Sequence, residues 1–208
     1  KKRLSWDELS ALVSRIQQAL KGAGVGKGDR VAAMMPNLPE TVALMLAVTS
    51  LGAIWSSCSP DFGERGVLDR FGQIEPKVFI AVDGYWYNGK ALSLEGKLKG
   101  IVPHLPTAKT VVIVPYLNEA EALAKALPNA VTLDAFLKPF AAKLLTFERL
   151  PFNHPAFILY SSGTTGVPKC IVHGAGGTLL QHVKEHRLQS DVRAGDRVFY
   201  FTTCGWMM

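Results

Sequence analysis

Cysteine is scarce in this sequence and occurs in no paired spacing. The three cysteines, Cys58, Cys170 and Cys204, lie far apart, and no CxxC motif is present. Neither a zinc site nor a framework of disulfide bonds is therefore indicated, and we expect no metal held by the protein itself. The chain also has no recognisable signal peptide and no apolar run of about 18 residues, the length that a membrane-spanning helix needs. These absences predict a protein of the reducing cytoplasm without a membrane role.

An excess of one sign of charge is present but small. Lysine and arginine number 23 and aspartate and glutamate number 17, which gives a net charge of +6. The basic residues are scattered and form no stripe with interleaved aromatic residues, so nucleic acid is not favoured as a partner. A basic surface without a special role and a general attraction to anions such as nucleotide phosphates both fit this pattern. We expect small-molecule substrates.

Helical and strand-like patterns alternate along the chain. Ser5 and Glu8 form the pattern of a capping box, and apolar residues then recur at helical spacing until Gly22. Apolar strands are predicted at 29–35, 53–59, 77–82, 110–114, 130–134, 155–160, 170–173 and 196–203, and further helices at 37–53, 63–75, 118–127 and 175–190. Nearly continuous apolar strands separated by helices indicate an α/β fold with a largely parallel sheet flanked by helices. Residues 83–108 and 115–155 carry weaker patterns and are expected to be peripheral to the sheet.

The stretch "LYSSGTTGVPKCIVHG" at 159–174 places a polar, glycine-rich segment between two apolar runs. Glycine permits backbone angles that let consecutive N–H groups converge on an anion. Hydroxyl groups add donors, and a lysine adds a positive charge suited to a phosphate oxygen. A linker would need no lysine and a hairpin turn only one glycine, so the combination indicates a polyphosphate ligand. The candidate ATP phosphate-binding residues are Ser161, Ser162, Gly163, Thr164, Thr165, Gly166 and Lys169.

Two other nucleotide-binding motifs fit less well. Gly163 and Lys169 have the separation found in a Walker loop, but Pro168 replaces its second glycine and Cys170 its magnesium-binding hydroxyl. A Walker loop also runs from a strand into a helix, whereas this loop is predicted to run from strand to strand. The glycines at 22–28 resemble a dinucleotide-binding motif only loosely and follow a helix, so they are interpreted as a helix stop.

The segment "YSSGTTGVPK" resembles the phosphate-loop signature of the adenylate-forming enzymes, which include acyl-CoA synthetases, adenylation domains of peptide synthetases and luciferases. The segments "SSGTTGVPKCIVHGAGGTLLQHVKEH" and "GDRVFYFTTCGWMM" are most similar to the branch of acyl-CoA synthetases that activates acetoacetate. The similarity extends over essentially the whole chain. It implies that residues 1–208 form part of the large N-terminal ATP- and acyl-binding domain, without the C-terminal domain that carries the family's catalytic lysine.

The resemblance implies a two-step reaction that uses ATP, Mg²⁺ and coenzyme A. The carboxylate of acetoacetate attacks the α-phosphate of ATP to give an acyl-adenylate and pyrophosphate, and the thiol of coenzyme A then displaces AMP. The loop at 161–169 would hold the β- and γ-phosphates with magnesium and stabilise charge on the leaving pyrophosphate. No catalytic residue is assigned within the chain, and the chain alone is expected to be inactive because the family's downstream elements are not among its residues.

The resemblance also implies an acyl pocket at the segment "CGWMM". Trp206 would form a wall of this pocket, and Met207 and Met208 would shape the space for the acyl group, since methionine adapts to irregular gaps. Ordinary core packing is an equally open interpretation of these three residues.

A looser correspondence implies contacts with the nucleotide end of coenzyme A. The candidate CoA-binding residues are Trp55, Ser56, Ser57 and Lys90. Relatives have arginines in the region of Tyr87 and Lys90, so this chain departs from the family pattern at the point where the contact is expected.

Two alternatives stand beside an acetoacetate ligase. One is a related ligase for another short-chain acid such as acetate or propionate, since only Met207 and Met208 bear on the acid. The other is a noncatalytic module that binds a nucleotide without chemistry. The histidines indicate no further site, because His182 and His186 lack the glutamate of an HExxH motif and a third ligand, and His173 is interpreted as structural.

Overall fold

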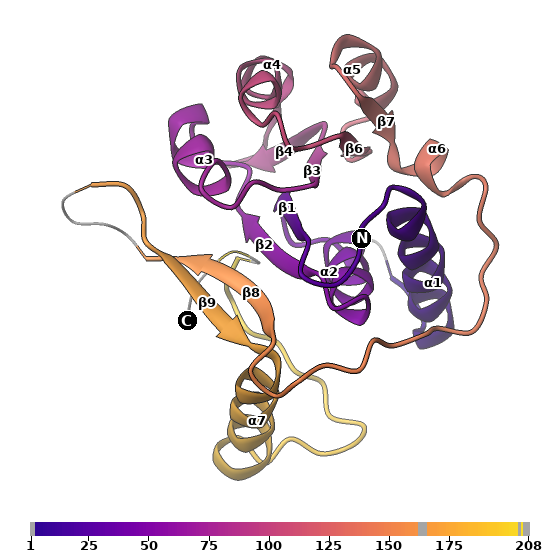
Figure 1. Cartoon of the computed structure of the whole chain (residues 1–208), viewed down its shortest axis with the longest axis vertical. Helices are drawn as coiled ribbons and strands as arrows, with labels where there is room; N and C mark the ends of the chain where they lie inside the picture. Colours follow the sequence, from indigo (N-terminus) through magenta and orange to yellow (C-terminus); the bar gives the residue numbers. More distant parts are fainter. Residues whose placement is uncertain (1–2, 162–165, 204, 206–208) are drawn as a thin grey trace.

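A seven-stranded sheet lies at the centre of the molecule (Figure 1). The computed structural model describes residues 3–161, 166–203 and 205. The strands of the sheet are β1 (Arg30–Met34), β2 (Ile54–Cys58), β3 (Val78–Val82), β6 (Thr110–Val114), β7 (Ala130–Thr132), β8 (Pro155–Tyr160) and β9 (Cys170–Gly174). Their order is β7-β6-β3-β1-β2-β8-β9, and every neighbouring pair is parallel except β8 and β9. A separate antiparallel hairpin pairs β4 (Gly84–Tyr87) with β5 (Lys90–Ser93).

Helices cover both faces of the sheet. α1 and α2 lie on one face, and α3, α4 and α5 lie on the other (Figure 1). The helices are α1 (Trp6–Gly22), α2 (Pro39–Ser50), α3 (Glu64–Phe71), α4 (Glu95–Ile101), the short 3₁₀-helix η1 (Val102–His104), α5 (Ala120–Ala126), α6 (Leu133–Leu137), α7 (Ala175–Lys184) and its π-helical continuation η2 (Glu185–Gln189). The predicted α/β fold with a largely parallel, helix-flanked sheet is confirmed.

The central strands are apolar on both faces because both faces are covered. All five residues of β3 are buried, and four of the five residues of β6 are buried. Strands buried on both faces appear in the sequence as continuous apolar runs rather than as alternating apolar and polar residues. Such runs are easy to recognise, so the sequence predicts these strands well. None of the helices within the described residues has the length and apolar character needed to cross a membrane.

Two buried polar residues on α1 hold down a long irregular segment, residues 138–154, which we call the strap. The capping box predicted at the start of α1 is present, with the Glu8 N–H donating to the Ser5 hydroxyl at 3.2 Å. Further along, the hydroxyl of Ser14 donates to the carbonyl oxygen of Lys143 at 2.7 Å, and the Gln17 amide donates to the carbonyl oxygen of Thr146 at 2.6 Å. The strap therefore satisfies polar groups that would otherwise be buried without partners.

The weakly patterned middle of the chain behaves largely as expected. The hairpin of β4 and β5 lies outside the main sheet, and the strap runs along the surface from α6 to β8 (Figure 1). β7 is the exception, because it extends the sheet as its edge strand beside β6.

The strand predicted at 196–203 is wrong, because these residues are irregular. Val198 and Phe201 are exposed, Phe201 by 92%. An apolar and aromatic run favours a strand only where another strand can pair with it, and within the described residues β9 ends the sheet on this side.

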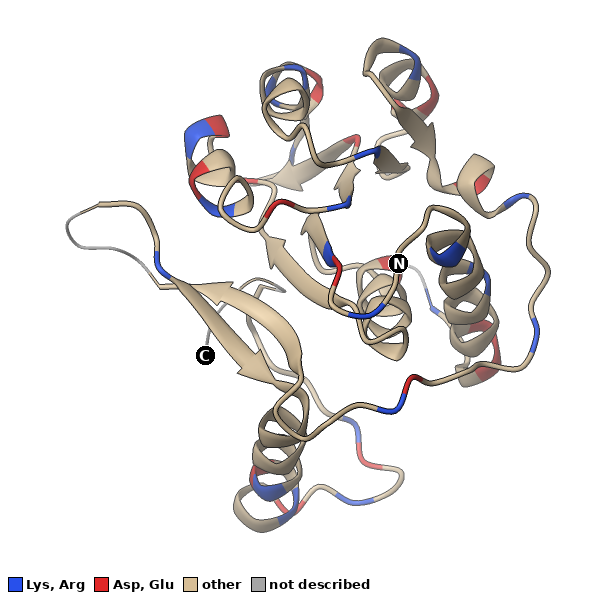
Figure 2. Ribbon diagram, viewed as in Figure 1, with Lys and Arg blue, Asp and Glu red and all other residues tan. Residues whose placement is uncertain are grey.

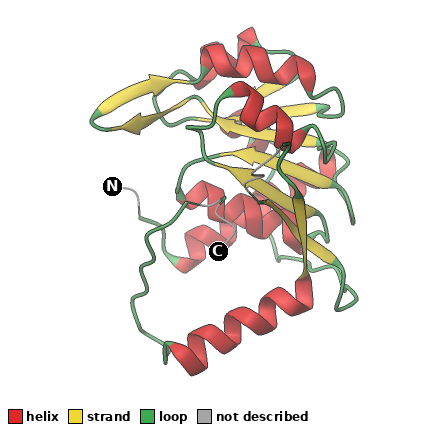
Figure 3. Cartoon of the chain, turned by 90° about the vertical axis from the view of Figure 1, so that its left-hand side faces the viewer, coloured by secondary structure: helices red, strands yellow, loops and turns green. Residues whose placement is uncertain are grey.

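Charges of both signs are mixed on the surface helices, and α7 stands apart from the other helices. Figure 2 shows acidic and basic residues interspersed on α3, α4 and α5, as the scattered sequence pattern predicts. α7 projects from the layered body (Figures 1 and 3) and buries none of its residues.

Candidate functional site

A cavity of about 540 Å³ opens at the carboxyl edge of the sheet. It lies where β1, β2 and β6 end and where the hairpin follows β3, which is the edge at which open α/β sheets bind ligands. Its walls come from four neighbouring parallel strands and from the irregular segment near the end of the chain. The lining residues are Met35, Pro36, Asn37, Ser59, Pro60, Asp61, Tyr85, Trp86, Tyr87, Tyr116, Tyr200, Phe201, Thr202 and Thr203.

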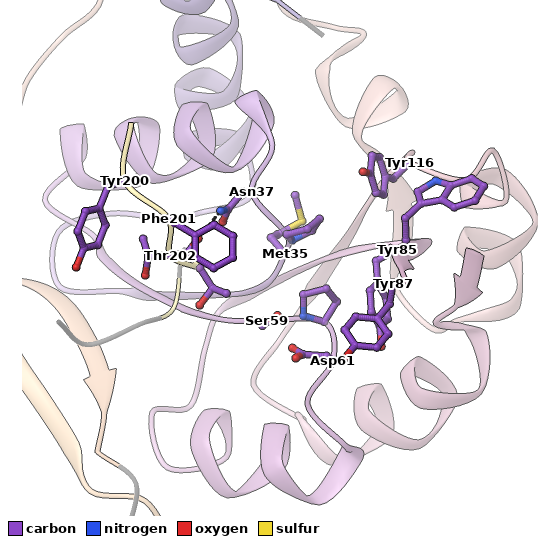
Figure 4. A pocket seen from close by; sticks show the side chains of 14 residues that line it. Met35, Asn37, Ser59, Asp61, Tyr85, Tyr87, Tyr116, Tyr200, Phe201 and Thr202 are labelled. Carbon is purple, nitrogen blue, oxygen red and sulfur yellow. Dashed lines mark hydrogen bonds between the residues drawn. The ribbon is translucent and has the colours of Figure 1, made fainter. Parts of the chain in front are cut away.

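Six of the residues that line the cavity are aromatic. Figure 4 shows Tyr85, Tyr87 and Tyr116 on one side and Tyr200 and Phe201 on the other. We call the residues Tyr85, Trp86, Tyr87 and Tyr116 the aromatic wall. Such rings can stack on a planar heterocycle and supply hydroxyl groups at their ends, so the cavity suits a ligand with a flat, polar ring.

Asn37 forms a hydrogen bond that holds the side of the cavity opposite the aromatic wall. Its amide nitrogen donates to the carbonyl oxygen of Thr202 at 2.6 Å. This bond joins the loop after β1 to the segment that carries Tyr200 and Phe201, so the cavity has two walls contributed by distant parts of the chain.

The predicted phosphate loop leaves the same edge of the sheet. β8 and β9 form an antiparallel hairpin, and the N–H of Ser161 donates to the carbonyl oxygen of Lys169 at 3.1 Å, which closes the stem of the loop. The side-chain amide of Gln73, just after α3, donates to the carbonyl oxygen of Pro168 at 2.9 Å. Gly166 has a φ of 155°, a conformation that residues with a side chain rarely adopt. The predicted passage from strand to strand is confirmed, and it separates this loop from a Walker loop.

Buried hydroxyl groups support the base of the loop. The Ser56 hydroxyl lies 2.8 Å from the carbonyl oxygen of Ile158 and 2.9 Å from the hydroxyl of Tyr160. Because the carbonyl oxygen can only accept, Ser56 donates to it and Tyr160 donates to Ser56. Burial raises the pKa of the Tyr160 phenol, so this group stays a neutral donor at physiological pH. β2 thereby holds the residue that immediately precedes the loop.

The cavity and the loop stem are neighbours through the sheet register. Ser56 of β2 pairs with Ile158 of β8, so the ends of these two strands, Cys58 and Tyr160, lie level with one another. The loop after Tyr160 and the cavity residues after Cys58 therefore leave the sheet from adjacent strands in the same direction.

A family model described as AMP-binding enzyme matches residues 1–208, which is the whole chain. The chain belongs to the AMP-binding enzyme family. It is 66% identical over 206 residues to an acetoacetyl-coenzyme A synthetase of Rhizobium meliloti and 49% identical over 210 residues to that of Macaca fascicularis. A solved structure of acetoacetyl-CoA synthetase from Streptomyces lividans covers 99% of the chain with a TM-score of 0.91 and 40% identity. The chain spans 31% of the length of each of these proteins.

The structure places part of the predicted phosphate loop of this AMP-binding chain. Ser161, Gly166 and Lys169 lie at the stem, and the Lys169 side chain is exposed. Ser162, Gly163, Thr164 and Thr165 lie outside the described residues, as do the predicted acyl-pocket residues Trp206, Met207 and Met208. The phosphate-binding and acyl-binding roles of all these residues stay predictions.

The predicted CoA-binding residues fall into two places. Trp55, Ser56 and Ser57 are buried within β2, where the Trp55 indole N–H donates to the Ser57 hydroxyl at 3.2 Å. Lys90 lies on the exposed hairpin strand β5. The hydrogen bonds of Ser56 point to support of the loop, and a direct contact of any of the four with coenzyme A stays a prediction.

Sequence reasoning missed several residues of this region. Gln73 and Tyr116 have no motif, and their roles come only from the residues that the fold brings to them. Asp83 carried a signal that could have been used, because a carboxylate directly after the buried run Val78–Val82 falls at the functional edge of a parallel sheet.

Among the residues that the structure describes, the histidines do not form a metal site. The rings of His182 and His186 stack at 6.3 Å, and the described residues contain no group of three or more potential metal ligands. His173 lies on β9 opposite Phe157, and its Nε2 is buried without a hydrogen-bond partner in the described part of the chain.

Cys58 is expected to resist thiol reagents until the protein unfolds. Burial raises the pKa of its thiol from 9.0 to about 12, so the reactive thiolate is absent at pH 8 and the sulfur is also shielded. Because the folded pKa is raised, the thiol's contribution to stability is fully present below about pH 9 and is lost as the pH rises toward 12. Iodoacetamide labelling at pH 8, with and without denaturant, followed by peptide mass spectrometry, tests this. Labelling of Cys58 in the native protein at the rate seen in denaturant would contradict its burial.

Proposed function

We propose that the chain is part of an AMP-forming acid–thiol ligase that converts acetoacetate, ATP and coenzyme A to acetoacetyl-CoA, AMP and pyrophosphate. The observation that carries the proposal is the similarity to acetoacetyl-CoA synthetases over 99% of the chain. The juxtaposition of a lysine-bearing loop stem and an aromatic cavity at one edge of the sheet supports it, because the reaction needs a polyphosphate and a second ligand side by side.

The polyphosphate of ATP would be held at the loop of residues 161–169. Lys169 supplies the positive charge among the described residues of this loop, and Ser161 lies opposite it in the stem through a backbone hydrogen bond. The described residues contain no cluster of side chains that could hold a metal ion, so Mg²⁺ would be bound through the phosphates, whose negative charge it neutralises. Holding pyrophosphate in place makes it a better leaving group when the carboxylate attacks.

Coenzyme A would use the aromatic cavity for its flat adenine ring. The rings of the aromatic wall offer stacking surface, and the Asp61 carboxylate offers an acceptor for an exocyclic amino group. Lys90 lies on the strand paired with Tyr87, so its charge is available near that wall for a phosphate. The acyl group would lie against Trp206, Met207 and Met208. The enzyme would act in the cytoplasm.

Pyrophosphate exchange into ATP by the full-length protein tests the proposal. We expect exchange to depend on an added acid and to be fastest with acetoacetate among acetoacetate, acetate, propionate and butyrate. A separately prepared chain of residues 1–208 is expected to form no CoA thioester, because relatives are about three times as long.

Each other outcome of this experiment selects an alternative. Fastest exchange with acetate or propionate would favour a related short-chain ligase. No exchange with any acid, in a protein that still binds MgATP, would reject the ligase and leave a noncatalytic nucleotide-binding module. Thioester formation by residues 1–208 alone would contradict the expected need for further parts of the protein.

A further inference from the structure

Asp83 is a fully buried acidic residue that the proposed reaction does not use. It follows β3 directly, and its side chain has no exposed surface. One carboxyl oxygen accepts hydrogen bonds from the backbone N–H groups of Tyr116 and Leu117, each at 2.8 Å. The other accepts from the N–H of Glu119, also at 2.8 Å. Three short bonds to one buried carboxyl group bind the loop after β6 tightly to the end of β3.

The backbone of Asp83 ties the hairpin to the same point. Its N–H donates to the carbonyl oxygen of Val114 at 3.3 Å, and its carbonyl oxygen accepts from the N–H of Leu94 at 3.0 Å. Asp83 therefore joins both ends of the β4–β5 hairpin to β6 and its loop, which are more than 20 residues away in the sequence.

The neighbouring packing leaves little freedom at this junction. A Cβ added to Gly84 would clash with the side chain of Leu117 and would lie 2.6 Å from the carbonyl oxygen of Leu92. The Ser93 hydroxyl also donates to the Glu119 carboxylate at 2.8 Å. The hairpin and the loop at 115–119 are thus packed as one unit, with Asp83 at its centre.

The aromatic wall of the cavity is built from both of the segments that Asp83 joins. Tyr85, Trp86 and Tyr87 come from the hairpin, and Tyr116 comes from the loop, so the two halves of the wall have no covalent connection close to the cavity. Asp83 bonds the N–H of Tyr116 itself and lies two residues before Tyr85. The Asp83 carboxyl group therefore links the two halves and helps to set the spacing between them.

We propose that Asp83 is a positioning residue for coenzyme A, acting through the aromatic wall. This inference rests on the proposed function, in which the cavity receives coenzyme A. Adenylation needs ATP and the acid but not coenzyme A, so the inference predicts that the two half-reactions respond differently to a change at Asp83.

Asp83→Asn and Asp83→Ala in the full-length protein test the inference. In Asp83→Asn the side-chain amide keeps one oxygen that can accept a hydrogen bond. Its NH₂ group takes the place of the other oxygen and cannot accept from the loop N–H that bonds there. We expect the KM for coenzyme A to rise about tenfold in Asp83→Asn and further in Asp83→Ala, while pyrophosphate exchange changes less than about twofold. Asp134→Asn, which removes an exposed carboxylate on α6, is the matched control and is expected to change neither.

Hydrogen exchange gives a readout that does not depend on activity. In Asp83→Asn, faster amide exchange is expected at 84–93 and 115–119, with the protection of β1 and β3 unchanged. This variant also keeps the inference testable if Asp83→Ala does not fold.

The outcomes separate the inference from the proposed function. An equal loss of exchange and of thioester formation, or an unchanged KM for coenzyme A, would overturn the positioning role. A wild-type protein that forms no CoA thioester would instead reject the proposed function, and the hydrogen-exchange result would still report on the aromatic wall.

Discussion

Replacing Lys169 with alanine is expected to slow acid-dependent pyrophosphate exchange about a hundredfold or more. Lys169 is exposed at the stem of the loop, where the Ser161 N–H bonds its carbonyl oxygen and the Gln73 amide bonds the carbonyl oxygen of Pro168. Its backbone is therefore held while its side chain is exposed, so that it could reach a phosphate. In the proposed reaction, removing this charge would take away stabilisation of the negative charge that develops on the leaving pyrophosphate.

Two further variants test whether the effect depends on the position and the shape of the charge at Lys169. Lys125→Ala, an exposed lysine on α5, removes the same charge elsewhere and is expected to leave exchange within about twofold of wild type. Lys169→Arg keeps the charge but replaces a compact ammonium with a planar fork, so a partial loss is expected. Exchange that is unchanged in Lys169→Ala would remove the loop from the proposed mechanism.

Replacing Phe71 with alanine is expected to lower the free energy of unfolding by about 3–5 kcal/mol. Phe71 is fully buried at the end of α3, and its ring meets Phe79 edge-on at 6.0 Å and Tyr160 at 6.3 Å. Truncation leaves a cavity between α3 and the sheet and removes two aromatic contacts. Because Tyr160 immediately precedes the predicted phosphate loop, pyrophosphate exchange is expected to fall as well.

Urea unfolding of wild type, Phe71→Ala and Phe71→Leu measures this effect. Leucine fills much of the space, so its cost is expected to be below about 1.5 kcal/mol. A loss below about 1 kcal/mol in Phe71→Ala would show that the contact between α3 and the sheet is not closely packed.

Local patterns in the sequence predicted most of the fold and the type of ligand. The capping box at Ser5 and Glu8 and the apolar runs of β1, β3 and β6 act over a few residues, so they are visible without knowledge of the partners. The composition of residues 161–169 indicated a polyphosphate because hydroxyls, glycines and a lysine are needed together in one short segment.

Only the tertiary structure decided how these parts meet. The three N–H groups bound by Asp83 lie more than 30 residues away in the sequence. The strap residues that bond to Ser14 and Gln17 lie about 130 residues away. Hydrophobic periodicity extends over a few turns or one strand, so it cannot predict contacts at such separations. Residues 196–203 are irregular despite their apolar composition, and in the described part of the chain no strand pairs with them. The sequence by itself determined most of the central strands and helices, and it predicted a polyphosphate ligand for the loop at 161–169. The strand order, which depends on long-range packing, decided that the aromatic cavity and the loop share one edge.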